Sequence, residues 1–177
     1  MRYEVVFLDR DGVINRMRHD YVRGWQDVEF LPGALEAIGR LTRSGRQVIV
    51  ATNQSAIAQG LVSSRDVNVI HRQMAAAVAA TGGMIRAFLV CPHGAADGCT
   101  CRKPAPGLFL RARDELGVRL ENAIMIGDQL WDLEAARAAG VGAILVDPDG
   151  SRKRPDHLMT YAVVANLAEA ADIVCDG

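Results

Sequence analysis

Residues 3–12 read YEVVFLDRDG, and this short stretch decides the fold. Residues 3–8 are mostly apolar and rich in β-branched and aromatic side chains, which predicts a strand buried on both faces. Asp9 and Asp11 follow directly, and Gly12 permits the chain to bend after them. A buried strand that ends in two carboxylates indicates a sheet with a polar site at its edge.

The rest of the chain alternates strand and helix patterns around this first strand. Further strands are predicted at residues 47–51, 86–90, 123–126, 143–146 and 162–164. Helices are predicted at residues 34–42, 63–80, 107–116 and 132–139, with a last turn of helix near the C-terminal end. This alternation predicts an α/β fold, a doubly wound, Rossmann-like parallel sheet in a three-layer sandwich. Residues 1–177 are expected to form a single domain, and residues 149–157 a charged, solvated loop.

Composition narrows the range of partners. Half of the residues are hydrophobic, 23% are charged, and the net charge is −1, so the chain is globular without a global attraction for nucleic acid or anionic membranes. No apolar stretch approaches the roughly 20 residues of a membrane-spanning helix, and the N-terminal run is too short for a signal peptide. A soluble, cytoplasmic protein that acts on a small molecule is expected, and a monomer, because aromatic residues make up only 5% of the chain.

Polar side chains follow each of the first four strands, where parallel sheets bind their ligands. They are Asp9 and Asp11; Thr52, Asn53, Gln54 and Ser55; Arg102 and Lys103; and Asp128, with Asp132 in the helix that follows. Each group has an ordinary structural explanation, such as a turn, surface bases or, for Asp132, a helix N-cap. Together, carboxylates that suit Mg²⁺ and cations that suit phosphate predict phosphoryl transfer.

Four segments resemble, in this order, the motifs of the haloacid dehalogenase (HAD) superfamily of phosphatases. They are FLDRDGVIN at 7–15, ATNQS at 51–55, RKPAPG at 102–107 and IGDQLWD at 126–132. The resemblance implies an HAD-type fold, here with a minimal cap because the chain has no room for a large insertion. It also implies an aspartyl-phosphate mechanism that requires Mg²⁺.

The resemblance assigns roles to individual residues. Asp9 would be the nucleophile, and Asp11 would be the general acid and base. Thr52 and Lys103 would hold the transferred phosphoryl group. Asp9, Asp128 and the backbone carbonyl of Asp11 would bind Mg²⁺.

The segment CPHGAADGCTC at 91–101 points to a subgroup of this family. It resembles the zinc loop of heptose bisphosphate phosphatases and histidinol-phosphate phosphatases, which implies a structural zinc held by Cys91, His93, Cys99 and Cys101. Three thiolates and one imidazole form a closed tetrahedral site, whereas a disulfide would leave one of these thiols over. The metal would fix the direction in which the next two residues leave the loop, and Cys175 is expected to take no part.

The substrate implied by the resemblance is a small phosphorylated sugar. Residues 14–34 resemble heptose bisphosphate phosphatases, which remove the 7-phosphate of D-glycero-D-manno-heptose 1,7-bisphosphate for heptose nucleotide and lipopolysaccharide synthesis. Histidinol phosphate is the alternative substrate, and a phosphate-binding protein without turnover is a third hypothesis. The expected substrate-binding residues are Asn53, Gln54, Ser55, Arg102, Arg18, His19 and Asp20. Ala56, Gln59 and Gln129 depart from the family pattern and affect the expected sugar preference.

Overall fold

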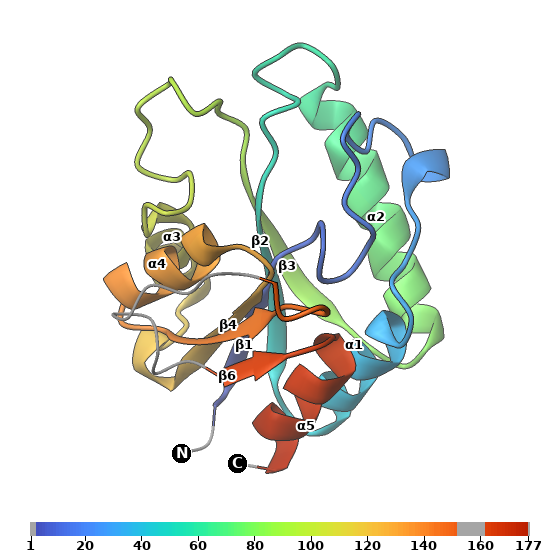
Figure 1. The fold of residues 1–177 in the computed structure, drawn as a ribbon, viewed down its shortest axis with the longest axis vertical. Helices are drawn as coiled ribbons and strands as arrows, with labels where there is room; N and C mark the ends of the chain where they lie inside the picture. Colours follow the sequence, from blue (N-terminus) through green and yellow to red (C-terminus); the bar gives the residue numbers. More distant parts are fainter. Residues whose placement is uncertain (1–2, 152–161, 177) are drawn as a thin grey trace.

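A computed structural model describes residues 3–151 and 162–176. At its centre is a six-stranded, wholly parallel sheet in the order β3-β2-β1-β4-β5-β6 (Figure 1). The strands are β1 (Val5–Leu8), β2 (Gln47–Asn53), β3 (Ile85–Cys91), β4 (Ala123–Gly127), β5 (Gly142–Val146) and β6 (Ala162–Val164). The helices are α1 (Ala34–Arg43), α2 (Ser64–Ala80), α3 (Gly107–Leu116), α4 (Leu130–Ala138) and α5 (Leu167–Asp176), with short 3-10 helices η1 (Trp25–Asp27) and η2 (Leu120–Asn122).

This arrangement confirms the predicted doubly wound α/β sandwich. The chain begins in the middle of the sheet, because β1 pairs with β2 on one side and with β4 on the other. The strand order therefore reverses between β1 and β4, and ligands of such folds bind at this switch point.

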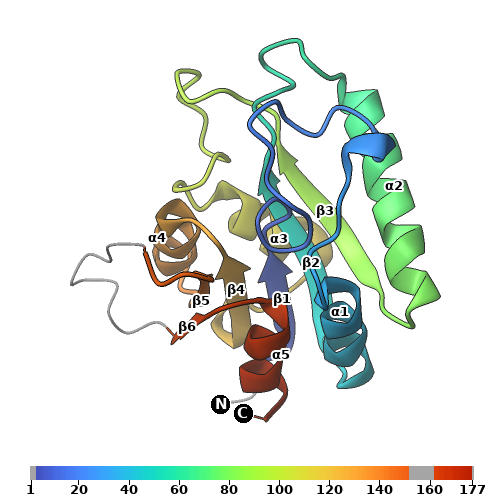
Figure 2. The ribbon, with the colours of Figure 1, turned by 45° about the vertical axis from the view of Figure 1, so that its right-hand side comes forward.

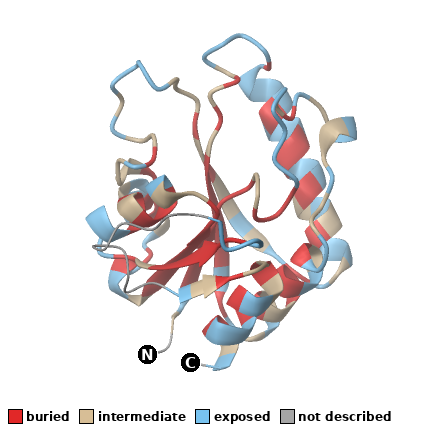
Figure 3. Cartoon of the chain, viewed as in Figure 1, coloured by how far each residue is buried: buried red, intermediate tan, exposed pale blue. Residues whose placement is uncertain are grey.

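The two faces of the sheet bury alternate residues of the same strands. Val6 and Leu8 of β1 pack in the core formed with α1, α2 and α5, whereas Val5 and Phe7 pack in the core formed with α3 and α4. Figure 2 shows these helices on opposite sides of the sheet, and Figure 3 shows the strands at its centre as buried. Because both faces are covered, β1 is apolar throughout and does not alternate with polar residues.

Two sequence predictions about helices need correction. Asp132 is not the N-cap of α4: Gln129 is the N-cap, and the Asp132 carboxylate accepts a hydrogen bond from the Gln129 backbone N–H at 3.0 Å. The C-terminal element is a full helix of ten residues, not a single turn, because Leu167, Ala170, Ala171 and Val174 place an apolar face on the core.

The remaining sequence predictions concern the cap, the charged loop and membrane-spanning helices. Residues 9–33 contain only η1, so the cap is minimal, as predicted. The predicted charged loop at 149–157 lies mostly outside the described residues. Among the residues that the structure describes, no helix is long and apolar enough to cross a membrane.

Candidate active site

Three carboxylates and one lysine meet at the switch point of the sheet. Asp9 follows β1, Asp128 follows β4, and Asp132 lies in the first turn of α4; their nearest oxygens lie within 4.8 Å of one another. The Lys103 ammonium lies 3.0 Å from Asp9 Oδ1 and 2.5 Å from Asp132 Oδ1, and it donates to the Ala51 carbonyl at 2.7 Å. All four side chains are almost fully buried.

Glycine is required where this cluster closes. Gly12 has a φ of +87°, and a Cβ there would lie 2.6 Å from Cγ of Asp128. A Cβ on Gly127 would lie 2.6 Å from Cγ of Asp132. The predicted bend at Gly12 is thus confirmed, and it brings the loop after β1 onto the carboxylate after β4.

Burial and charge oppose each other in this cluster. Burial, together with the negative charges of Asp132, Asp128 and Asp11, raises the pKa of Asp9 to about 7, although Lys103 acts to lower it. Burial alone would lower the pKa of Lys103, but Asp132 and Asp9 raise it above its ordinary value. The lysine therefore stays charged and neutralises one of three carboxylates.

The donor set of this cluster fits a divalent cation. Three carboxylates face a single ammonium, so the cluster retains negative charge where water is largely excluded. A bound cation would relieve the repulsion that raises the pKa of Asp9. Buried carboxylate oxygens are the ligands that Mg²⁺ prefers, whereas Zn²⁺ prefers nitrogen and sulfur.

Asp11 is held by donors from three directions. Arg10 binds it through two nitrogens, with Nη2–Oδ2 at 2.8 Å and Nε–Oδ2 at 3.2 Å. Asn15 donates to Oδ1 and Gln54 to Oδ2, each at 2.9 Å. The Asp11 carboxylate thus has a fixed orientation at the wall of the cavity described below.

The end of β2 and the residue after it supply the amides and the hydroxyl that the sequence predicted. Thr52 is buried, and its hydroxyl accepts a hydrogen bond from the Gln54 amide at 2.9 Å. Asn53 exchanges two hydrogen bonds with the backbone of Lys103, both at 3.1 Å. Gln54 and Asn53 therefore connect the end of β2 to Asp11 and to the lysine.

A cavity of about 320 Å³ opens beside these groups. Its lining residues are Asp9, Arg10, Asp11, Met17, Arg18, Tyr21, Val22, Asn53, Gln54, Arg102, Gln129 and Trp131. Four predicted substrate-binding residues, Asn53, Gln54, Arg102 and Arg18, are thus brought together. Among the described residues, three others do not line this cavity: His19, Asp20, which pairs with Arg18 at 2.8 Å, and Ser55.

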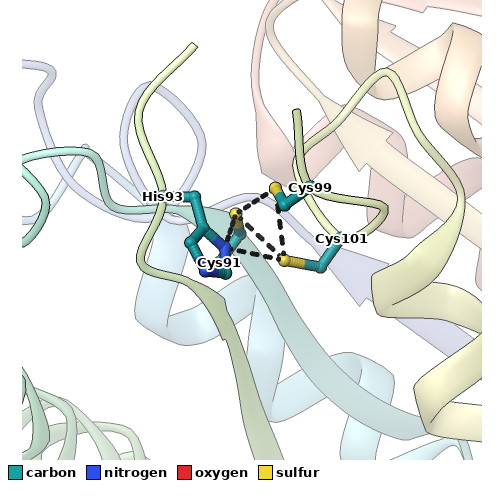
Figure 4. Close-up of side chains that lie close together, drawn as sticks. All are labelled: Cys91, His93, Cys99 and Cys101. Atoms are coloured by element: carbon teal, nitrogen blue, oxygen red, sulfur yellow. Dashed lines mark hydrogen bonds between the residues drawn. The ribbon is translucent and has the colours of Figure 1, made fainter. Parts of the chain in front are cut away.

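The cysteine segment forms a second, separate cluster beyond β3. Figure 4 shows Cys91, His93, Cys99 and Cys101 with their ligand atoms turned toward one another. The sulfur and Nδ1 atoms are separated by 3.2–3.7 Å in the five pairs that make contact. Zn²⁺ at about 2.3 Å from sulfur and about 2.0–2.1 Å from nitrogen would place tetrahedral ligands about 3.5–3.8 Å apart. The donor set and its spacing therefore fit Zn²⁺.

The thiols of this cluster differ in their surroundings. Burial raises the pKa of Cys91 to about 12. At Cys99, hydrogen bonds with the Arg102 backbone, with the side chain and backbone of Cys101 and with the Cys91 side chain outweigh burial and lower the pKa to about 7. Cys175 lies apart, with its sulfur 3.4 Å from the Ser44 hydroxyl, as the sequence predicted.

Several residues of the site were not found from the sequence. Arg10 lies between two aspartates, an unusual place for a base, but the sequence pattern alone assigns it no role. His71 lies 3.3 Å from Arg10 and stacks on Phe88, but it is 61 residues away in the chain and no local pattern marks it. Met17 and Trp131 are 46% and 44% exposed and face the cavity, which hydrophobicity patterns do not predict.

Comparisons with known proteins agree with this geometry. Residues 3–140 match the family model of haloacid dehalogenase-like hydrolases. The chain is 42% identical over 150 residues to D-glycero-beta-D-manno-heptose-1,7-bisphosphate 7-phosphatase of Bordetella bronchiseptica, covering 85% of this chain and 84% of that protein. It is 46% identical over 145 residues to the alpha-heptose enzyme of Mycobacterium tuberculosis, covering 78% and 75%.

Solved structures show the same fold. The Bordetella bronchiseptica phosphatase, crystallised with magnesium and phosphate, superposes with a TM-score of 0.89 at 37% identity and covers 99% of both chains. The heptose bisphosphate phosphatase of Burkholderia thailandensis gives 0.72 at 30% identity, covering 98% of this chain and 99% of that one. The chain therefore belongs to the haloacid dehalogenase-like hydrolase family and is a phosphoric monoester hydrolase.

Proposed function

We propose that the protein removes the 7-phosphate of D-glycero-D-manno-heptose 1,7-bisphosphate in heptose nucleotide synthesis, as a cytoplasmic, single-domain enzyme. The observation that carries this proposal is that one cavity is lined both by Asp9 and Asp11 and by Arg18 and Arg102. A bisphosphate has two anionic ends, and this cavity offers a reaction centre for one and guanidinium groups for the other. The similarity to heptose bisphosphate phosphatases supports a heptose as the sugar of the substrate.

The proposed chemistry has two steps. An Asp9 carboxylate oxygen attacks phosphorus, the bond from phosphorus to the sugar oxygen breaks, and Asp11 gives its proton to the departing 7-hydroxyl. Asp11 then takes a proton from water, which attacks the aspartyl phosphate and releases inorganic phosphate. Lys103 and Thr52 hold the phosphoryl oxygens, and Lys103 is placed for this by its contact of 3.0 Å with Asp9.

Two metals have separate places in this proposal. Asp9, Asp128 and the backbone carbonyl of Asp11 would hold Mg²⁺, which when bound supplies positive charge for the phosphoryl oxygens. Asp132 instead fixes Lys103 and the start of α4. Cys91, His93, Cys99 and Cys101 would hold a structural Zn²⁺.

The experiment that tests the function compares phosphate release from both anomers of heptose 1,7-bisphosphate and from histidinol phosphate, with Mg²⁺ present. We expect one heptose anomer to have the highest kcat/KM. The relatives include both beta and alpha enzymes, so the anomer is an outcome of this measurement. A higher kcat/KM for histidinol phosphate would contradict the proposed substrate and leave the catalytic residues unchanged. A monomeric enzyme without nucleic-acid or membrane partners stays a prediction.

A further inference from the structure

Arg10 is a buried cation with few partners, so each of these partners helps to fix its position. Only 1% of its surface is exposed. Among the described residues, Asp11 is the only carboxylate that it pairs with, and it donates to both oxygens of that group. A buried charge is stable only where its partners are fixed, so Arg10 and Asp11 hold each other in place.

His71 supplies the other fixed point of Arg10. Its Nε2 atom lies 3.3 Å from Arg10 Nη1. A guanidinium can only donate, so His71 Nε2 accepts this hydrogen bond and the ring proton is on Nδ1. In the described part of the chain, Nδ1 is buried and has no hydrogen-bond partner. The fold thus leaves a buried donor unsatisfied while the ring presents its acceptor to Arg10.

The histidine ring is itself held by the fold. It comes from α2 and lies flat on the Phe88 ring of β3, with centroids 4.3 Å apart and planes 11° apart. Its side chain has little freedom to turn away from Arg10, since only 3% of the residue's surface is exposed. A continuous chain of contacts therefore runs from Phe88 of β3 to His71 of α2, and from there through Arg10 to Asp11.

The geometry points to His71 as a positioning residue that acts through Arg10 to orient the carboxylate of Asp11. This inference rests on the proposed function, in which Asp11 protonates the leaving group. Without an acceptor at His71, Arg10 loses one of its two anchors, and its grip on both oxygens of Asp11 loosens. The step most affected is proton transfer to an alkoxide, because general acid catalysis depends on precise placement.

The test uses two substrates that differ in their need for an acid. Heptose 1,7-bisphosphate has an alkyl leaving group that must be protonated, whereas p-nitrophenyl phosphate has one that needs no proton. His71→Phe keeps a ring on Phe88 but removes the acceptor, and His71→Gln keeps an acceptor without the stacked ring. Val78→Ala is the control, because it removes buried volume from the same helix at a residue that has no polar side-chain atom to bond Arg10.

We expect His71→Phe to lower kcat/KM about tenfold or more for the sugar phosphate and no more than about twofold for the aryl phosphate. His71→Gln should restore most of the lost selectivity, and Val78→Ala should lower the melting temperature without changing the ratio of the two kcat/KM values. Equal losses on both substrates, or no loss on either, would overturn the inference. If His71→Phe does not fold, His71→Asn replaces it, because its carboxamide is too short to reach Arg10.

Failure of the proposed substrate gives a different result. Wild-type protein would then hydrolyse neither heptose anomer, and the ratio would be measured on the alkyl phosphate that it hydrolyses best. An unchanged ratio in His71→Phe would still overturn the role of His71. An enzyme that hydrolyses no alkyl phosphate at all would overturn both proposals.

Discussion

The two clusters of side chains that could hold a metal ion lie at the same end of the sheet but are built in opposite ways. Asp9, Asp128 and Asp132 follow strands or begin a helix, and they are buried in the fold itself. Cys91 ends β3, but Cys99 and Cys101 belong to a long loop and are only partly buried. The sheet therefore positions the oxygen cluster before any ion binds, whereas we expect the loop of the sulfur cluster to need a bound ion to hold it.

This difference predicts that the oxygen cluster serves catalysis and that the sulfur cluster serves the structure of its loop. Loss of a ligand from the oxygen cluster should abolish turnover and leave the fold intact. Loss of a ligand from the sulfur cluster should loosen the loop and reduce turnover only through the displacement of Arg102 and Lys103.

The largest effect is expected for Asp9→Asn, which removes the proposed nucleophile. We expect kcat to fall by more than about 10³-fold. Zinc content and the circular dichroism spectrum should stay unchanged, because Lys103 retains Asp132 and the Ala51 carbonyl as partners. Asp114→Asn, at an exposed carboxylate of α3 paired with Arg113, is the matched control and should keep full activity. Near-native activity in Asp9→Asn would refute the assignment of the nucleophile.

Withdrawal of Mg²⁺ should have the next largest effect and should distinguish the two clusters directly. In buffer without Mg²⁺ we expect turnover to fall at least about 10²-fold, because several kcal/mol of charge stabilisation are lost. Re-addition of Mg²⁺ should restore activity, while elemental analysis finds zinc retained throughout. Full activity without added Mg²⁺, in protein shown to be free of the ion, would contradict an oxygen cluster that uses it.

Cys99→Ser tests the sulfur cluster by removing one of its four proposed ligands. Removing one of four ligands should abolish stoichiometric zinc, since a structural site needs all of its ligands. The loop should become sensitive to proteolysis, and kcat/KM should fall by about 10–100-fold, the usual range for groups that support a site indirectly. Cys175→Ser is the control, since this thiol lies outside the cluster. One zinc per chain in Cys99→Ser would show that the site is not Cys₃His.

The sequence predicted the sheet and both clusters because their signals are local. Buried strands are short apolar runs, and the ligands follow them directly. The role of Asp132 was predicted incorrectly, because the start of α4 depends on the backbone of Gln129 and on a lysine that is distant in the sequence. His71 could not have been found, because its contact with Arg10 exists only after α2 packs on the sheet.

The smallest effect concerns His71, which the fold buries beside the Arg10–Asp11 pair. Burial, together with the positive charge of Arg10, lowers the pKa of this histidine from 6.5 to about 3. The unfolded chain therefore binds a proton below pH 6.5 that the folded protein does not bind. The free energy of unfolding should decrease as the pH falls below that value, by at most about 1.4 kcal/mol per pH unit from this residue.

His71→Gln isolates this contribution, because glutamine does not titrate and the carboxylates are unchanged. Urea unfolding at several pH values should give a shallower decline between pH 6.5 and 4 in the variant than in the wild type. Parallel curves for the two proteins would mean that His71 takes up a proton in the folded state. Its Nε2 could then no longer accept a hydrogen bond from Arg10, and the proposed role of His71 in positioning Asp11 would be lost.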